Sequence, residues 1–194
     1  MTERIYSLFQ QSVEAKMHVG EQLAPLIEQA GNILVDSLLN EGKVLICGNG
    51  TSAALAQIFS SALIDRYEQE RPSLPAIWLG SNVATYTAIS ADTQHANVYA
   101  KPIRALGTPN DTLVVISTSG NSANLLQAVR AAHERNLRVI ALTGRDGGDI
   151  AKHLNEHDIE IRVELPSRGR IHEVHLLIIF CLCNHIDFNL FGLE

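Results

Sequence analysis

The chain has 194 residues, of which 46% are hydrophobic and 19% charged, and its formal net charge at pH 7 is −6. This composition is typical of one globular domain and excludes a disordered chain. The acidic balance, without a long Lys/Arg cluster, argues against direct binding to nucleic acid. No apolar stretch reaches the roughly 18 residues that cross a bilayer. With no secretion signal and an odd number of cysteines, we expect a cytoplasmic protein that contacts no membrane.

The first forty residues show helical periodicity and no strand pattern. Apolar positions recur three and four residues apart in two stretches, from Ile5 to Val13 and from Leu23 to Leu34. Pro25 falls in the first turn of the second stretch, where its missing N–H costs little. We therefore expect a helical hairpin over residues 1–40, with an apolar stripe that packs on its own sheet or on a partner subunit.

Strand and helix patterns alternate through residues 41–194. Runs rich in Val, Ile and Leu predict strands at 43–47, 75–79, 112–117, 137–143 and 158–163. Helices are predicted at 52–66, 83–90, 97–106, 122–135, 147–154 and 169–187, the last apolar on nearly every side. Strands that are apolar on both faces suit a parallel sheet covered by helices. The expected fold is a doubly wound, flavodoxin-like α/β sheet of five strands, with the whole chain, 1–194, forming one domain.

Two polar loops directly follow predicted strands. Gly48–Ser52 follows the first strand, and Ser117–Ser122 follows the third. Glycine lets the backbone approach a ligand, while hydroxyls and the N–H groups of a helix start can bind phosphate. The first loop alone also fits an ordinary tight turn, but helix capping explains only one of the four hydroxyls in the second. Since ligands of doubly wound folds bind outside the carboxyl ends of the strands, the two loops predict a cradle for a phosphate and the polar end of a sugar.

Three further motifs leave alternatives open. Gly144–Gly148 follows the fourth strand and favours an ordinary glycine turn. His172 and His175 lie three residues apart, so they could share a helical face and bind a metal, or one could line a pocket while the other packs. Glu173 between them could transfer protons or pair with Arg168 or Arg170.

The apolar tail from Phe188 to Leu193 is a separate feature, because its side chains would cost free energy in water. We expect it to dock either inside its own subunit or on a partner.

These segments together resemble the sugar isomerase (SIS) domain family, and more narrowly its phosphoheptose isomerase branch. The resemblance rests on the two loops and on residues 70–77, 141–148 and 170–175, and it covers nearly the whole chain. It implies a phosphosugar-binding fold that forms homotetramers with pockets near subunit boundaries. The positions that it assigns to phosphosugar binding are Asn49, Thr51, Ser52, Ser117, Thr118, Ser119, Ser122 and His172.

The same resemblance implies where an active isomerase holds a metal and transfers protons. Those positions carry Ile58, Ala62, His172 and Phe180 here, and three of the four can neither ligate zinc nor move a proton. We therefore expect no catalytic residues, no metal and no cofactor. The alternatives are a sedoheptulose 7-phosphate isomerase with a rearranged site built from His172, Glu173 and His175, and a phosphosugar-sensing regulator.

The chain is also similar to the initiator-associating DiaA branch of the family. The similarity lies in residues 3–5, 98–107 and 181–187, and in the near-terminal Leu190 and Phe191. It implies a non-catalytic homotetramer that binds the replication initiator DnaA and promotes its assembly at the chromosomal origin. Leu190 and Phe191 are the implied contacts with the partner or between subunits.

Overall fold

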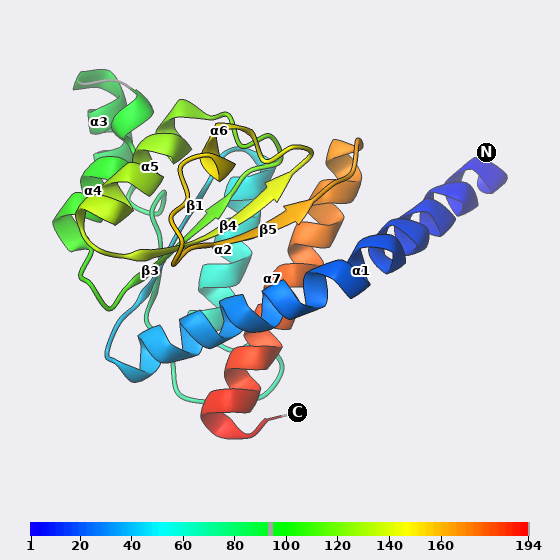
Figure 1. Cartoon of the computed structure of the whole chain (residues 1–194), viewed down its shortest axis with the longest axis horizontal. Coiled ribbons are helices and arrows are strands. Elements are labelled where there is room, and N and C mark those ends of the chain that lie inside the picture. The colour runs from blue at the N-terminus through cyan, green and yellow to red at the C-terminus, as the bar shows by residue number, and fades with distance from the viewer. Residues whose placement is uncertain (93–94, 194) are drawn as a thin grey trace.

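The structure is a computed structural model that describes residues 1–92 and 95–193, and its centre is a five-stranded parallel sheet with helices on both faces (Figure 1). The strands are β1 (Val44–Gly48), β2 (Ala76–Trp78), β3 (Thr112–Ile116), β4 (Arg138–Gly144) and β5 (Ile159–Val163). The helices are α1 (Thr2–Leu39), α2 (Thr51–Ile64), α3 (Val83–Asp92), α4 (Ala100–Leu106), α5 (Ala123–Glu134), α6 (Gly148–Ala151) and α7 (Arg168–Phe191), with a 3₁₀ turn η1 (His95–Asn97) before α4.

The strands lie in the order β2-β1-β3-β4-β5, and every pair is parallel. Each strand separates two apolar clusters because successive side chains point to opposite faces. Ile46 and Val114 belong to the cluster under α1, α2 and α7, whereas Leu45 and Leu113 belong to the cluster under α4 and α5. The doubly wound, flavodoxin-like prediction is therefore confirmed.

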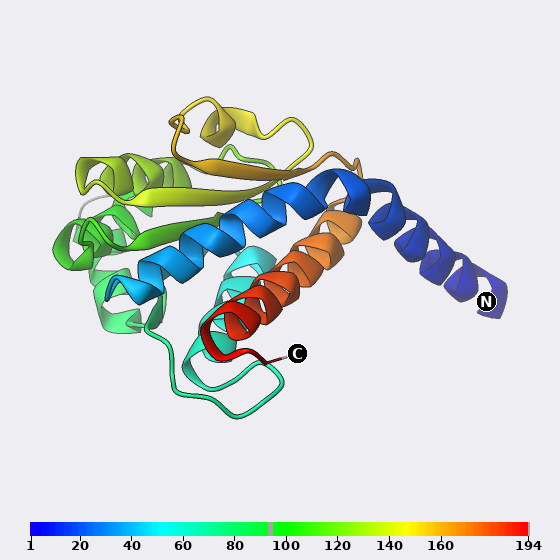
Figure 2. The same ribbon diagram turned by 60° about the horizontal axis from the view of Figure 1, so that its bottom comes forward.

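The predicted N-terminal hairpin is wrong, because α1 is one continuous helix from Thr2 to Leu39. Pro25 lies inside this helix rather than at the start of a second one. Residues 14–22 join the two predicted patterns and contain one glycine and no other turn residue, so nothing there favours a reversal over continued helix. The C-terminal half of α1 packs on α7 and β5. The N-terminal part of α1 extends beyond the body (Figure 2), attached to it by the hydrogen bond of Ser12 to Glu173 on α7, and the helix bends along its length.

Helix α7 packs between α1 and α2 and buries nine of its residues. Its most apolar 18-residue window has a mean hydropathy of 1.6, so by length and composition alone it would also suit a membrane span. A buried helix in the core of a globular domain has the same composition. Leu190 and Phe191 at its end are half-buried against their own core, and contact with a partner stays a prediction for them.

Candidate functional site

The two polar loops lie side by side because their strands are neighbours. β1 and β3 pair in register, with Gly48 opposite Ile116 at their carboxyl ends. The chain reverses direction across the sheet between these two strands, which is where doubly wound folds bind ligands. A cavity of about 250 Å³ opens there. It is lined by Asn49, Ser52, Ile116, Ser117, Thr118, Ser119, Ser122, Leu125, Arg145 and Arg168, and we call it the cradle.

The first wall of the cradle is the turn after β1. The hydroxyl of the buried Tyr99 donates to the carbonyl of Gly48 over 2.6 Å. The Asn49 side chain exchanges two hydrogen bonds with the amide of Asn124, at 2.8 and 2.9 Å. Nε2 of His95 lies 3.3 Å from the Asn124 amide nitrogen. These contacts fix the turn and the orientation of the Asn49 side chain.

The second wall is the serine loop after β3. Oγ of Ser117 accepts the N–H of Gly120 over 3.0 Å, which closes the loop on itself. Gly120 has a φ of 66°, a conformation that glycine adopts without steric cost. Ser122 is the N-cap residue of α5, and no hydrogen bond ties its side chain to the helix. Hydroxyls and N–H groups of a helix start therefore face one small space, as a phosphate requires.

The third wall is the loop after β4, which the sequence analysis interpreted as an ordinary turn. Arg145 from this loop and Arg168 from the start of α7 both line the cradle. A glycine-rich segment at the carboxyl end of a strand next to β3 was the signal that could have placed Arg145 here.

The structure brings together six of the eight predicted phosphosugar residues. Asn49, Ser52, Ser117, Thr118, Ser119 and Ser122 line the cradle, whereas Thr51 and His172 do not. Thr51 is exposed at the start of α2.

His172 lies one helical turn after Arg168 on α7. Both of its ring nitrogens are buried and have no hydrogen-bond partner among the described residues. Burial, and then the charge of Arg168, lower the pKa of His172 below its usual value, so the imidazole is neutral near pH 7.

The other two members of the predicted rearranged site are occupied elsewhere. His175 is fully buried and its Nε2 donates to the carbonyl of Thr143 over 2.8 Å. Burial lowers the pKa of His175 to about 4. Glu173 accepts hydrogen bonds from Arg170 and from the hydroxyl of Ser12.

The residues of the described chain do not fit a metal ion. In residues 1–92 and 95–193, no three His, Cys, Asp or Glu side chains gather closely enough to hold one. Ile58 is 38% exposed on α2, Ala62 packs against the core from the same helix, and Phe180 stacks on Tyr67 with ring centroids 5.6 Å apart. We derive no chemical step through a metal.

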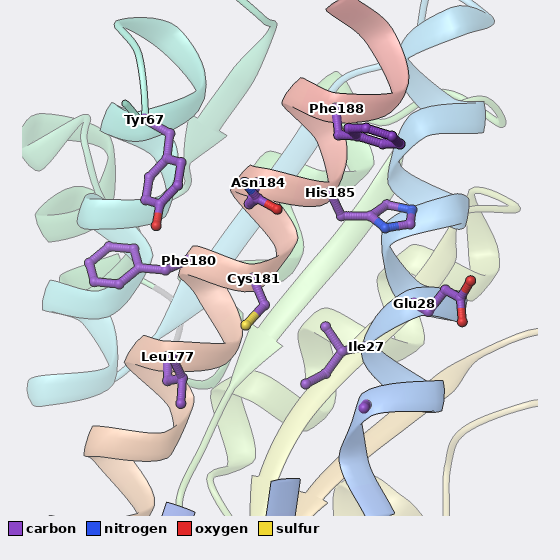
Figure 3. A pocket seen from close by; sticks show the side chains of 10 residues that line it. Ile27, Glu28, Tyr67, Leu177, Phe180, Cys181, Asn184, His185 and Phe188 are labelled. Atoms are coloured by element: carbon purple, nitrogen blue, oxygen red, sulfur yellow. The ribbon is translucent and has the colours of Figure 1, made fainter. Parts of the chain in front are cut away.

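A larger cavity of about 550 Å³ lies elsewhere, along α1 and α7 (Figure 3). Ile27, Leu177, Phe180 and Phe188 give it an apolar lining, and Tyr67 points into it from the segment after α2. It lacks the hydroxyls and arginines of the cradle. We call it the α1–α7 groove.

Comparison with known proteins places these features in a family. The family model described as the SIS domain matches residues 8–144. A phosphoheptose isomerase of Chromohalobacter salexigens is 53% identical over 97% of this chain and 96% of the relative, and one of Thiobacillus denitrificans is 50% identical over 99% and 98%. Among solved structures, phosphoheptose isomerase GmhA of Neisseria gonorrhoeae has a TM-score of 0.90 and 44% identity, covering 96% of this chain and 98% of that one.

These relatives contradict the prediction of a non-catalytic protein that binds DnaA. Proteins about half identical over the full length are named phosphoheptose isomerases, which are enzymes. The prediction took Ile58, Ala62 and Phe180 as proof that the reacting groups are lost. The structure shows that none of these three side chains lines the cradle of its own chain, so their apolar character leaves its polar walls intact.

Proposed function

Because this chain belongs to the SIS domain family and to its phosphoheptose isomerase-like branch, we propose that it binds a phosphorylated heptose in the cradle and isomerises it. The observation that carries the proposal is the cradle itself. Six hydroxyl or amide side chains from two loops share one cavity with two arginines. Hydroxyls and N–H groups bind phosphate oxygens, and guanidinium groups supply the opposite charge.

Interconversion of an aldose and a ketose phosphate moves a proton between neighbouring carbons through an enediol. This step needs a deprotonated base that reaches the carbon-bound proton. We assign it to His172, which lies outside the cradle, four residues after Arg168 on one face of α7. The reacting carbons of a heptose 7-phosphate are several carbons from its phosphate, so they would lie beyond the phosphate-binding walls. The imidazole of His172 is neutral, and its nitrogens have no hydrogen-bond partner among the described residues.

The test is conversion of sedoheptulose 7-phosphate, followed by NMR of the sugar carbons. The wild-type protein should convert it, and His172→Ala should lower kcat by about 10²- to 10⁴-fold. His157→Ala is the matched control, because His157 is an exposed histidine that does not line the cradle. If the wild-type protein binds the phosphosugar but does not convert it, the isomerase proposal fails and a phosphosugar-sensing role takes its place.

We also propose that the chain forms a homotetramer. The support is apolar surface that one chain leaves exposed: the projecting part of α1 carries Phe9, Val13 and Met17, and the α1–α7 groove lies nearby on the body. Such surface marks an interaction site when it is contiguous. A cytoplasmic location belongs to the same proposal, supported by three cysteines that are all free thiols.

A further inference from the structure

The charged side chains that line the cradle are all positive. Arg145 and Arg168 are its two charged lining residues, and the lining includes no carboxylate. Neither guanidinium has a hydrogen-bond or ion-pair partner among the residues that the structure describes, although eight other lysine and arginine side chains do form ion pairs. Two unpaired guanidinium groups beside phosphate-binding hydroxyls create a site for an anion.

The loop that presents Arg145 is held tightly against the serine loop. The N–H of Ile150 donates to the carbonyl of Gly120 over 2.9 Å, and the N–H of Asp149 donates to Oδ1 of Asn121 over 2.9 Å. A β-carbon on Gly120 would come within 1.8 Å of the carbonyl oxygen of Gly147. The position of Arg145 relative to the serine loop is therefore fixed by direct backbone contact.

Arg145 also has an unfavourable backbone conformation. Its φ is 58°, in the left-handed region that glycine adopts freely and side chains with a β-carbon disfavour. Its neighbours in the sequence include Gly144, Gly147 and Gly148. The strained position nevertheless carries an arginine and not a glycine. Strain of this kind persists at functional sites, where the side chain has a use.

Arg168 approaches the cradle from a different element. It is the first residue of α7, and Ser167 before it caps the helix by accepting the N–H of Arg170. The charge of Arg168 also acts on His172 one turn later, so this guanidinium lies near His172 as well as lining the cradle.

We propose that Arg145 and Arg168 are the residues that select a doubly charged phosphate group, so that the cradle takes phosphorylated sugars and rejects uncharged ones. This inference rests on the proposed function, because it assumes that the cradle is the phosphosugar site. It adds the two side chains that supply the charge, from the loop after β4 and the start of α7. A hydrogen bond to a charged group is worth more than a neutral one, and that difference provides the discrimination.

Isothermal titration calorimetry of the full-length protein tests this proposal with sedoheptulose 7-phosphate, unphosphorylated sedoheptulose and inorganic phosphate. Arg145→Ala and Arg168→Ala should each weaken binding of the phosphosugar by about ten- to a hundredfold while changing binding of the free sugar by about twofold or less. Arg130→Ala, an exposed arginine of α5 outside the cradle, removes the same charge and should bind as the wild-type protein does.

A second variant separates the binding role from folding. Arg145→Gly removes the side chain and relieves the strain, so it should unfold at the wild-type temperature or above and still bind the phosphosugar weakly. Asn136→Gly is its control: Asn136 also has a positive φ, of 60°, but lies in the turn before β4, so its affinity should not change.

The outcomes separate this inference from the isomerase proposal. Unchanged phosphosugar affinity in both arginine variants, or an equal loss for the free sugar, would overturn the inference even if the wild-type protein is an isomerase. Arginine-dependent binding without conversion would sustain the inference and overturn the isomerase. A wild-type protein that binds no sugar phosphate and no inorganic phosphate overturns both.

Discussion

The side-chain amides of Asn49 and Asn124 form a reciprocal pair in which each donates to the other, at 2.8 and 2.9 Å. Asn49 directly follows β1 and Asn124 is the second residue of α5, so the pair joins the turn after β1 to the helix that follows the serine loop. Asn124 is 3% exposed, and its Oδ1 also accepts the N–H of Leu125. Both Nδ2 and Oδ1 of Asn49 therefore bond Asn124, and these two hydrogen bonds fix the orientation of the Asn49 side chain in the cradle.

Asn124→Asp should weaken the hydrogen bonding between residues 49 and 124. The new carboxylate can accept a hydrogen bond from Asn49 but cannot donate one, and it adds negative charge beside a phosphate site. We expect a loss of about 1–3 kcal/mol in the free energy of unfolding and weaker phosphosugar binding. Urea denaturation and calorimetry measure the two effects. Asn184→Asp, at an exposed amide of α7, should cost no more than about 0.5 kcal/mol; equal losses in the two variants would refute the role of the pair.

The sheet and two walls of the cradle could be predicted because their signals are local. Strand patterns such as 112–116 and the glycines and serines that follow them lie within a few residues of one another. The partner of Asn49 could not be predicted, since Asn124 is 75 residues away and the sequence around it predicts only a helix. Arg145 was missed although the glycine-rich segment at the carboxyl end of β4 was a usable signal, and only the packing of α7 shows that Arg168 lines the cavity.

The predicted hairpin failed for a different reason. Pro25 is compatible with a helix start and also with a bent helix, and the local sequence does not distinguish the two. Packing of α1 along α7 and β5 favours the continuous helix. The prediction of a non-catalytic protein failed because identities at Ile58, Ala62 and Phe180 were interpreted without knowing which side chains line the cavity.

Two glycines with positive φ should respond differently to alanine. Gly120 has a φ of 66° and no room for a β-carbon, since the carbonyl oxygen of Gly147 would lie at 1.8 Å. Gly50 has a φ of 56°, but nothing lies within 4 Å of its β-carbon position. Gly50 has a ψ of −123°, outside the left-handed helical region, so Gly50→Ala should cost only the strain of a sparsely populated backbone conformation, about 1–3 kcal/mol. Gly120→Ala should cost clearly more and abolish phosphosugar binding, as urea denaturation and calorimetry would show; equal losses would mean that the two loops separate easily.

The ion pair of Arg71 and Asp187 should be a major contributor to stability. Their side chains are 1% and 6% exposed, and Arg71 also donates to the carbonyls of Ala62 and Leu63. Arg71→Ala leaves the buried carboxylate of Asp187 without its ion pair and removes the hydrogen bonds to the two carbonyls, of which that of Leu63 still accepts the N–H of Leu74. We therefore expect a loss of about 3–5 kcal/mol in the free energy of unfolding. Guanidinium denaturation measures it.

The matched control for that pair is exposed. Arg66 pairs with Glu70, and their side chains are 46% and 83% exposed. Arg66→Ala should cost less than about 1 kcal/mol. Similar losses in the two variants would show that the buried pair contributes no more than a surface one.

Burial of His175 should make the protein less stable in acid. Its pKa is about 4 in the folded chain and 6.5 in the unfolded one, so between these values only the unfolded chain binds the proton. Its contribution is complete above pH 6.5 and is lost as the pH falls toward 4, at up to about 1.4 kcal/mol per pH unit. His175→Gln keeps a donor for the carbonyl of Thr143 and removes the titration. Urea denaturation should show the stability of the wild-type protein falling more steeply than that of the variant between pH 6.5 and 5.

The control for this pH dependence is His157→Gln. His157 has an 80% exposed side chain. Replacing it should leave the pH slope of the wild-type protein unchanged. If His175→Gln has the same slope as well, the buried imidazole does not set the acid sensitivity.

The projecting half of α1 should be a contact between subunits. Phe9 is 69% exposed and shares a helical face with Ile5 and Val13, both also exposed. Burying one phenylalanine contributes about 2 kcal/mol, so placing a carboxylate there in each chain should separate the subunits.

Light scattering after size exclusion should give four times the 21.2 kDa chain mass for the wild-type protein and a smaller mass for Phe9→Asp. Gln10→Asp adds the same charge at the next exposed position and should keep the wild-type mass. A wild-type monomer would refute the tetramer, and an unchanged mass for Phe9→Asp would place the contact elsewhere, with the α1–α7 groove as the next apolar surface to test.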